Sequence, residues 1–173
     1  TNGYGNVGIG NACGALVKTG YSNVGIGRSC LAGGYCDPVG YFALANIGLQ
    51  TGTRNCNYNT GIGHQALNGA GGDYNNINYL NGIANTGIGA YADVKCSYNA
   101  DLNTFVGAYC DTQSITTTPS YSTGVGTNVI IGNSNATALG ANASVYGLQS
   151  TAIGYNATVS ANNTIQLGTS TET

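Results

Sequence analysis

The stretch Asn59-Thr60-Gly61-Ile62-Gly63 recurs along the whole chain and decides its fold. Near copies begin at Asn6, Asn23 and Asn85, and looser copies bring the total to ten. The last three intervals between closing glycines are 14 residues each, whereas the earlier intervals run from 13 to 26. Self-similarity of this kind indicates a solenoid, in which each repeat is one coil. The closing glycines are Gly10, Gly27, Gly40, Gly63, Gly89, Gly107, Gly126, Gly140, Gly154 and Gly168.

Two positions of the repeat predict a strand with one apolar face. The residue before the closing glycine is aliphatic in all ten copies, and the residue two positions earlier is β-branched in nine. β-branched residues favour strands, and residues two apart share one strand face. We therefore expect both positions to point inward. The expected core ladder consists of Ile9, Ile26, Val39, Ile62, Ile88, Val106, Val125, Leu139, Ile153 and Leu167.

The residue between these two positions is glycine or alanine in most copies, and we expect it to point outward. A strand face that only contacts solvent does not require small residues. Their presence therefore predicts close packing against another chain or a neighbouring face. This expected interface column consists of Gly8, Gly25, Gly61, Gly87, Gly124, Ala138 and Ala152.

A second strand is expected in each repeat. A further small column lies three residues after the closing glycine, and Ile131, Val145 and Val159 lie five after it. We predict an all-β parallel β-solenoid of about ten coils, forming one domain over 1–173. Coils with loop insertions occupy 1–125, and regular 14-residue coils occupy 126–168. A glycine-rich β-sandwich with chance repetition is the alternative, and the glycine content argues against helices.

The regular array resembles a known repeat. Gly140-Ala141-Asn142-Ala143-Ser144-Val145 through Ser150-Thr151-Ala152-Ile153-Gly154 is similar to the YadA-like head repeats of trimeric autotransporter adhesins, with their Ser-Val-Ala-Ile-Gly core. The copies at 23–31 and 59–67 resemble the Asn-Thr-Ala-Ile-Gly repeats of phage and surface fibre proteins. The resemblance implies a left-handed parallel β-roll, usually trimeric, on bacterial surfaces.

Composition excludes several classes of function. Only 6% of residues are charged, against roughly 25% in ordinary soluble domains. The basic residues Lys18, Arg28, Arg54 and Lys95 are scattered, so no nucleic-acid partner is expected. No apolar run approaches the roughly 20 residues of a membrane span, so none is expected.

No constellation for catalysis, metal binding or cofactor binding is visible. His64 is the only histidine, and the Gly-x-Gly pairs lack the following helix of a phosphate loop. We therefore predict no enzyme, no metal and no cofactor. The threonine column is similar to the flat threonine ladders of ice-binding solenoids, but its expected inward placement argues against an ice face.

Two kinds of covalent modification are expected from the sequence. The even number of cysteines predicts disulfides and an oxidising compartment, with buried free thiols as the alternative. The pairs considered are Cys13–Cys30, Cys36–Cys56 and Cys96–Cys110. Four Asn-x-Ser/Thr sequons make candidate glycosylation sites of Asn135, Asn142, Asn156 and Asn162.

These features predict an extracellular protein, or one at a cell or virion surface, that associates with itself. The repeat begins near Thr1 and reaches Gly168 without recognisable caps, which predicts stacking of subunits or further repeats. The first hypothesis is a structural fibre subunit that self-assembles through packed faces and uncapped ends. The alternative is the head segment of a trimeric adhesin or a phage or surface fibre, binding a host glycan or surface protein.

Overall fold

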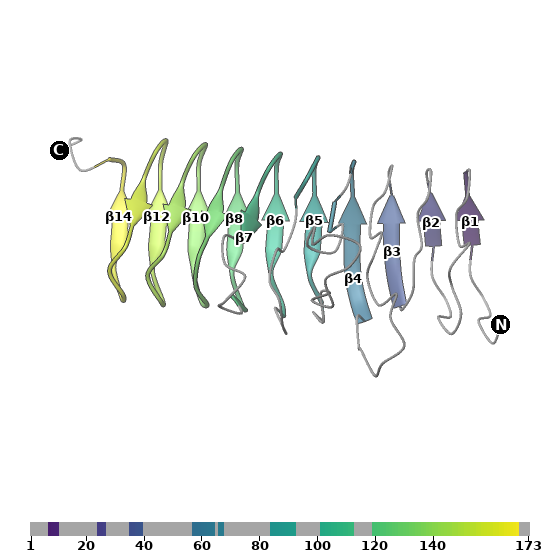
Figure 1. The fold of residues 1–173 in the computed structure, drawn as a ribbon, viewed down its shortest axis with the longest axis horizontal. Coiled ribbons are helices and arrows are strands. Elements are labelled where there is room, and N and C mark those ends of the chain that lie inside the picture. Colours follow the sequence, from purple (N-terminus) through teal and green to yellow (C-terminus); the bar gives the residue numbers. More distant parts are fainter. Residues whose placement is uncertain are drawn as a thin grey trace, which may run out of the picture.

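The chain is a parallel β-solenoid, as the repeat predicts. The computed structural model describes residues 7–10, 24–26, 35–39, 57–64, 66–67, 84–92, 101–112 and 119–169. Within these ranges all regular structure is β, and the strands pair in parallel in two sheets. Figure 1 shows the strands of successive coils standing side by side along one axis.

The larger sheet takes one strand from each of the ten repeats, in the order of the chain except for strands that belong to the second sheet. Its register aligns equivalent positions, so that Thr137 pairs with Thr151 and Leu139 pairs with Ile153. Each position of the repeat therefore becomes a ladder along the solenoid. The strands are β1 (Val7–Ile9), β2 (Val24–Ile26), β3 (Tyr35–Val39), β4 (Asn57–Ile62), β5 (Thr86–Ile88), β6 (Thr104–Val106), β8 (Thr123–Val125), β10 (Thr137–Leu139), β12 (Thr151–Ile153) and β14 (Ile165–Leu167).

The second sheet confirms the expected second strand of each regular coil. Its four strands are two residues long and run in the order β13-β11-β9-β7. Ile131, Val145 and Val159 occupy one ladder of this sheet and are all buried. The strands are β7 (Asp111–Thr112), β9 (Ile130–Ile131), β11 (Ser144–Val145) and β13 (Thr158–Val159).

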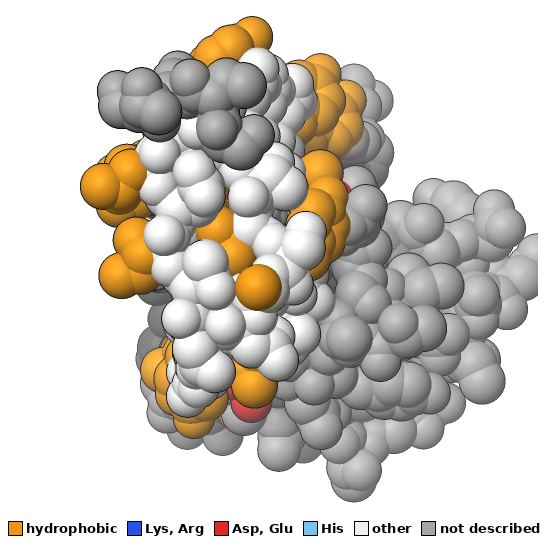
Figure 2. Space-filling model, turned by 90° about the vertical axis from the view of Figure 1, so that its left-hand side faces the viewer, with side chains coloured by type: hydrophobic (Ala, Val, Ile, Leu, Met, Phe, Trp, Pro, Cys, Tyr) orange, Lys and Arg blue, Asp and Glu red, His pale blue; other side chains and the backbone are white. Residues whose placement is uncertain are grey.

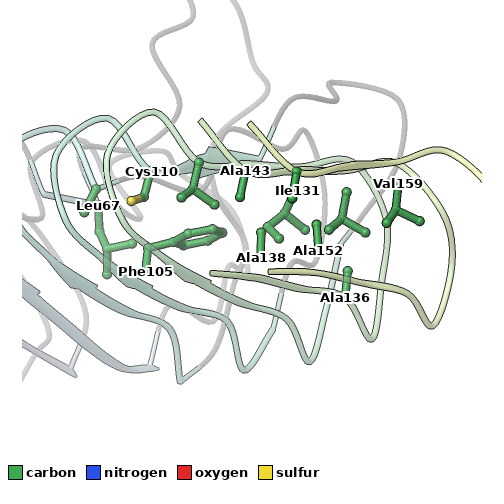
Figure 3. Packing of buried hydrophobic residues seen from close by; sticks show 13 residues of the cluster. Leu67, Phe105, Cys110, Ile131, Ala136, Ala138, Ala143, Ala152 and Val159 are labelled. Carbon is green, nitrogen blue, oxygen red and sulfur yellow. The ribbon is translucent and has the colours of Figure 1, made fainter. Parts of the chain in front are cut away.

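The core lies between the two sheets (Figure 3). The small column three residues after the closing glycine points into it, as expected. Ile131, Val145 and Val159 come from the second sheet, and Ala138 and Ala152 come from the ten-stranded sheet opposite. The buried members of the small column are Ala66, Ala92, Cys110, Val129, Ala143 and Ala157.

The expected orientation of the ten-stranded sheet is wrong. Leu139 and Ile153 are 44% and 37% exposed, whereas Ala138 and Ala152 are completely buried. The predicted core ladder therefore lies on the outside, and the predicted interface column lies on the inside. Of the ladder, Ile9, Ile26, Ile62, Ile88, Leu139, Ile153 and Leu167 are exposed, Val106 and Val125 are partly exposed, and the side chain of Val39 is outside the described residues. Of the expected interface column, Gly61, Gly87, Gly124, Ala138 and Ala152 are buried. The burial of Gly8 and Gly25 lies outside the described residues.

The physical reason is the narrow space between the sheets. A shift of one residue moves every side chain of a strand to the opposite face, so only one of the two columns can point inward. A methyl group added to Gly124 would lie 2.8 Å from Cδ1 of Phe105 and 3.0 Å from Cγ1 of Val129. The interior has room only for the glycine and alanine column of the large sheet, because the second sheet already fills the gap with larger residues.

Phe105 is the one large residue of the inward column, and it is completely buried. Its neighbours in the ten-stranded sheet are Gly87 on one side and Gly124 on the other. Two glycines thus leave the volume that one phenyl ring occupies. Because protein interiors are close-packed, this exchange of volume between adjacent coils keeps the core filled without strain.

In the described coils the closing glycine forms the corner after the strand of the large sheet. Gly63, Gly89 and Gly140 have φ between 130° and 132°, a backbone conformation that favours glycine. A Cβ on any of these three would lie 2.7 Å from the carbonyl carbon of the next closing glycine. Successive coils therefore touch backbone to backbone at this corner.

The regular coils consist of two seven-residue halves. A residue other than glycine adopts positive φ at every seventh position, with φ between 53° and 58°. Asparagine tolerates this left-handed conformation better than most residues, which explains its frequency at these corners. The residues are Asn128, Asn135, Asn142, Gln149, Asn156 and Asn163.

The asparagine of the repeat holds neighbouring coils together from inside. Asn85 and Asn103 are completely buried, and Nδ2 of Asn103 donates to Oδ1 of Asn85 (3.1 Å) and to the carbonyl of Pro119 (2.8 Å). The amide N–H of Ser122 donates to Oδ1 of Asn103 (3.1 Å). In the next coil Ser122 occupies the asparagine position, and its hydroxyl accepts from the N–H of Ala136 (3.1 Å). The sequence interpretation assigned no role to this position.

The orientation of the large sheet is tested by adjacent substitutions. Ala152→Leu places three further carbons in the filled core and lowers the free energy of unfolding by about 1–3 kcal/mol. Thr151→Leu, one residue away on the outer side, changes it by less than about 0.5 kcal/mol. Urea denaturation followed by circular dichroism measures both variants. A larger loss for Thr151→Leu than for Ala152→Leu would show that the faces are assigned wrongly.

The interior amide ladder is tested at Asn103. Asn103→Ala leaves the carbonyl of Pro119 and the N–H of Ser122 without their partner and lowers the free energy of unfolding by about 3 kcal/mol. Asn103→Ser, which introduces the residue that the next coil carries, costs less because the hydroxyl both donates and accepts. Thermal unfolding of the two variants compares them, and equal losses would contradict a hydrogen-bonding role.

Candidate interaction surface

The outward side of the ten-stranded sheet carries two parallel columns of side chains, which we call the outer face. One column is mainly threonine, and the other is the aliphatic residue before the closing glycine. The expectation that threonine points inward is therefore wrong for the described coils. The outer face consists of Thr60 and Ile62, Thr86 and Ile88, Thr104 and Val106, Thr123 and Val125, Thr137 and Leu139, Thr151 and Ile153, and Ile165 and Leu167.

The outer face is continuous and carries no charge from β4 to β14. Neighbouring strands lie about 4.8 Å apart, so the aliphatic side chains of successive coils touch one another. Ile165 and Leu167 are 72% and 65% exposed at the β14 end. Seen from this end, hydrophobic side chains project from the rim of the coils among uncharged polar atoms (Figure 2). A contiguous apolar surface of this kind marks a site of interaction.

The corner that follows the outer face carries a second ordered array. The rings of Tyr91 and Tyr109 stack on successive coils, with a centroid distance of 5.1 Å, and the ring of His64 is tilted by 37° against that of Tyr91 at 5.2 Å. Further along, Nδ2 of Asn128 donates to Oδ1 of Asn142 (3.2 Å), and Nδ2 of Asn142 donates to Oδ1 of Asn156 (3.1 Å). His64 thus contacts the ring of Tyr91. The sequence interpretation missed both arrays, although the 14-residue spacing of these asparagines is a signal for the second.

The four sequon asparagines lie at corners of the regular coils. Asn135, Asn156 and Asn162 are exposed, and Asn142 is half-buried. Nδ2 of Asn142 is the atom that would carry a glycan, and it is used in the amide ladder. Oδ1 of Asn162 accepts from the N–H of Leu148 (2.8 Å). Glycosylation of these four residues stays a prediction.

Cys110 is a free, buried thiol, so the expected pair of Cys96 and Cys110 is not formed. Its Sγ donates to the carbonyl of Gly126 in the next coil (2.9 Å). Burial raises the pKa of this thiol above its ordinary value, because a thiolate is poorly solvated inside the coil. The alternative interpretation, a thiol that fills the core, holds for this residue. The other candidates, Cys13, Cys30, Cys56, Cys96 and the side chain of Cys36, lie outside the described residues.

The described residues contain no group of three or more histidine, cysteine or acidic side chains placed to hold a metal ion. Over the same ranges, Oγ1 of Thr112 is the one buried side-chain oxygen or nitrogen without a hydrogen-bond partner. None of the described segments forms a helix with the length and hydropathy of a membrane span.

Comparison with known families places the C-terminal coils. Residues 133–157 and 146–171 match the YadA head domain repeat in two copies, which confirms the resemblance noted for this array. YadA head domains form trimers, and adhesins of this type are displayed on the cell surface. No curated protein and no solved structure matches the chain. The regular coils at the C-terminal end are therefore similar to a repeat of surface adhesins. The match does not extend to the coils before residue 133.

The raised pKa of Cys110 predicts a dependence of stability on pH. As pH rises past about 8.5, the thiol of the unfolded chain loses its proton before the folded one does, so folding becomes less favourable. Cys110→Ala removes this contribution. The difference in melting temperature between pH 7 and pH 10 is expected to be smaller for the variant than for the unmodified chain, as measured by scanning calorimetry. An unchanged difference would contradict the burial of the thiol.

Proposed function

We propose that this chain is a structural segment of an extracellular fibre displayed at a cell or virion surface, and that its copies associate through the outer face. The observation that carries the proposal is the ladder of exposed and partly exposed aliphatic residues on the outer face from β4 to β14. A monomer that kept this ladder in water would lose the favourable free energy of burying it.

The size of that free energy supports association. Burying one isoleucine or leucine side chain that is otherwise exposed contributes about 1.5–3 kcal/mol. Side chains such as Ile88, Leu139 and Ile153 are already more than half covered by their own coils, so each contributes a fraction of this value. The ladder repeats the contribution at every coil, which makes the face strong as a whole.

Self-association fits the face better than binding to a charged partner. The face carries no charge from β4 to β14, so it offers no electrostatic selectivity. Copies of one chain carry the same flat column pattern and can pack with their axes aligned. The YadA head repeat at 133–171 supports a closed trimer as the form of this packing, in line with cyclic oligomers in general.

The surface used differs from the one expected from sequence. The expected interface column cannot serve as an interface, because its members Ala138 and Ala152 are buried inside the coil. The aliphatic column replaces it in the proposal. The proposed role is mechanical and adhesive, in keeping with a repeat of an adhesin family.

A second candidate function is favoured by one observation. The threonine column faces outward, which removes the ground on which an ice-binding face was set aside. Regularly spaced hydroxyl and methyl groups on a flat, uncharged sheet suit an ordered layer of water. The two functions compete for the same face, so a monomer that inhibits ice growth would favour this candidate over self-association.

Self-association is tested by placing charges on the outer face. The double variant Ile88→Asp, Leu139→Asp keeps the fold because both side chains are exposed in the single chain, but it buries carboxylates between copies. An uncompensated buried charge costs about 3–5 kcal/mol, so the oligomer is expected to dissociate. Size-exclusion chromatography with light scattering and negative-stain imaging measure the change.

The matched control adds the same two charges elsewhere. Thr127→Asp, Thr158→Asp alters exposed residues of the corner and of β13, away from the outer face. This variant keeps the oligomer. A chain that is a monomer before any substitution, or an outer-face variant that stays assembled, would overturn the proposed use of the face.

A further inference from the structure

The corner beside the outer face carries a row of six side chains, which we call the corner row. It begins with aromatic rings and continues with side-chain amides, one in each of six successive coils. Its members are His64, Tyr91, Tyr109, Asn128, Asn142 and Asn156. Neither the proposed self-association nor the core uses these side chains.

The aromatic part of the row ends in an open ring face. Tyr109 stacks on Tyr91 with an angle of 8° between the ring planes, so one face of its ring is covered. The next coil carries Asn128 at the same corner position, as the matching backbone bonds of Tyr109 to Ala90 and of Asn128 to Ala108 show. Because asparagine is much shorter than tyrosine, the far face of the ring is not covered by an equivalent ring. Tyr109 is accordingly 56% exposed.

The amide part of the row begins in the next coil, at the same corner position as Tyr109. Asn128, Asn142 and Asn156 have φ of 55°, 58° and 56°, so their backbones hold the side chains in the same direction. Each amide has two N–H groups and two acceptor lone pairs. The ladder uses one donor and one acceptor of Asn142, so a donor and an acceptor of this residue remain available to solvent. The row therefore offers fixed donor and acceptor groups at every coil.

The corner row matches the chemistry of a neutral sugar chain. A pyranose ring has an apolar C–H face and a rim of hydroxyl groups that both donate and accept. The ring of Tyr109 supplies an apolar face, since tyrosine combines an apolar body with a polar tip. The amides supply partners for hydroxyl groups in a line along the solenoid. The stacked tyrosines and the asparagine ladder carry no charge, so the row offers nothing to select a sulfated or carboxylated sugar.

We infer that the corner row binds a neutral oligosaccharide, with one sugar ring against the open face of Tyr109 and the following sugars along Asn128, Asn142 and Asn156. The inference rests on the proposed surface display, because a displayed fibre segment meets glycans. It uses residues outside the outer face, so binding and self-association are separable.

The test uses isothermal titration calorimetry of the full chain with chitotetraose and cellotetraose, and a heparin tetrasaccharide as the charged comparison. At least one neutral probe is expected to bind in the millimolar range or tighter, and the charged probe is not. Tyr109→Ala is expected to weaken binding about tenfold, since truncation of a stacking ring removes a central contact.

Tyr121→Ala is the matched control. Tyr121 is also an exposed tyrosine with positive φ (58°, against 57° for Tyr109), but it lies at the opposite corner. The two variants therefore carry the same chemical change and the same backbone cost. An equal loss in both variants, or no heat with either neutral probe, overturns the inference and leaves the asparagine ladder with a purely structural role.

Light scattering of the same samples separates the two proposals. An assembled chain that binds no neutral probe refutes the corner row and leaves the fibre proposal standing. A monomeric chain that binds the probe, with the loss confined to Tyr109→Ala, refutes self-association and supports the corner row.

Discussion

The contact on which the whole structure depends is the stacking of closing glycines from coil to coil. A Cβ on Gly63, Gly89, Gly107, Gly126 or Gly140 would lie 2.7 Å from the carbonyl carbon of the next closing glycine. At the same corner the N–H groups of Gly89, Gly107, Gly126 and Gly140 donate to the carbonyl of the aliphatic residue in the preceding coil, which for Gly140 is that of Val125 (2.9 Å). The backbone of one coil thus rests directly on the next, and this contact fixes both the rise and the register of the solenoid.

Stacking in register means that each side chain lies against its own kind, and this explains the composition. A column of lysine or glutamate would place like charges directly opposite one another, which is destabilising in a sheet. Asparagine is suited to such columns because one amide donates while its neighbour accepts, inside the coil at Asn85 and Asn103 and outside it at Asn142 and Asn156. Isoleucine and threonine also pack well on themselves. The 6% of charged residues is thus a consequence of the architecture.

The periodicity of the sequence was enough to predict the parallel sheets, the second strand and the corners, because these depend on spacing alone. It was not enough to predict which face of the large sheet is buried. A three-residue strand alternates in either sense, and hydrophobicity favoured the wrong one, since the width of the gap depends on both sheets together. One signal was present: Phe105 lies in the glycine column between Gly87 and Gly124, and such an exchange of volume is expected only inside a packed core. The corner row was missed because its members change from aromatic rings to amides along the row, so that no single residue type repeats through all its coils.

The inverted orientation separates the part of each repeat that builds the coil from the part that meets other molecules. In Asn85-Thr86-Gly87-Ile88-Gly89, the asparagine and the two glycines serve the coil, while Thr86 and Ile88 face outward. The outer face keeps its register although the repeats differ in length: Thr60 pairs with Thr86 across 26 residues, just as Thr137 pairs with Thr151 across 14. Insertions between repeats therefore leave the ladder intact. A solenoid built in this way can vary its loops without altering the outer face.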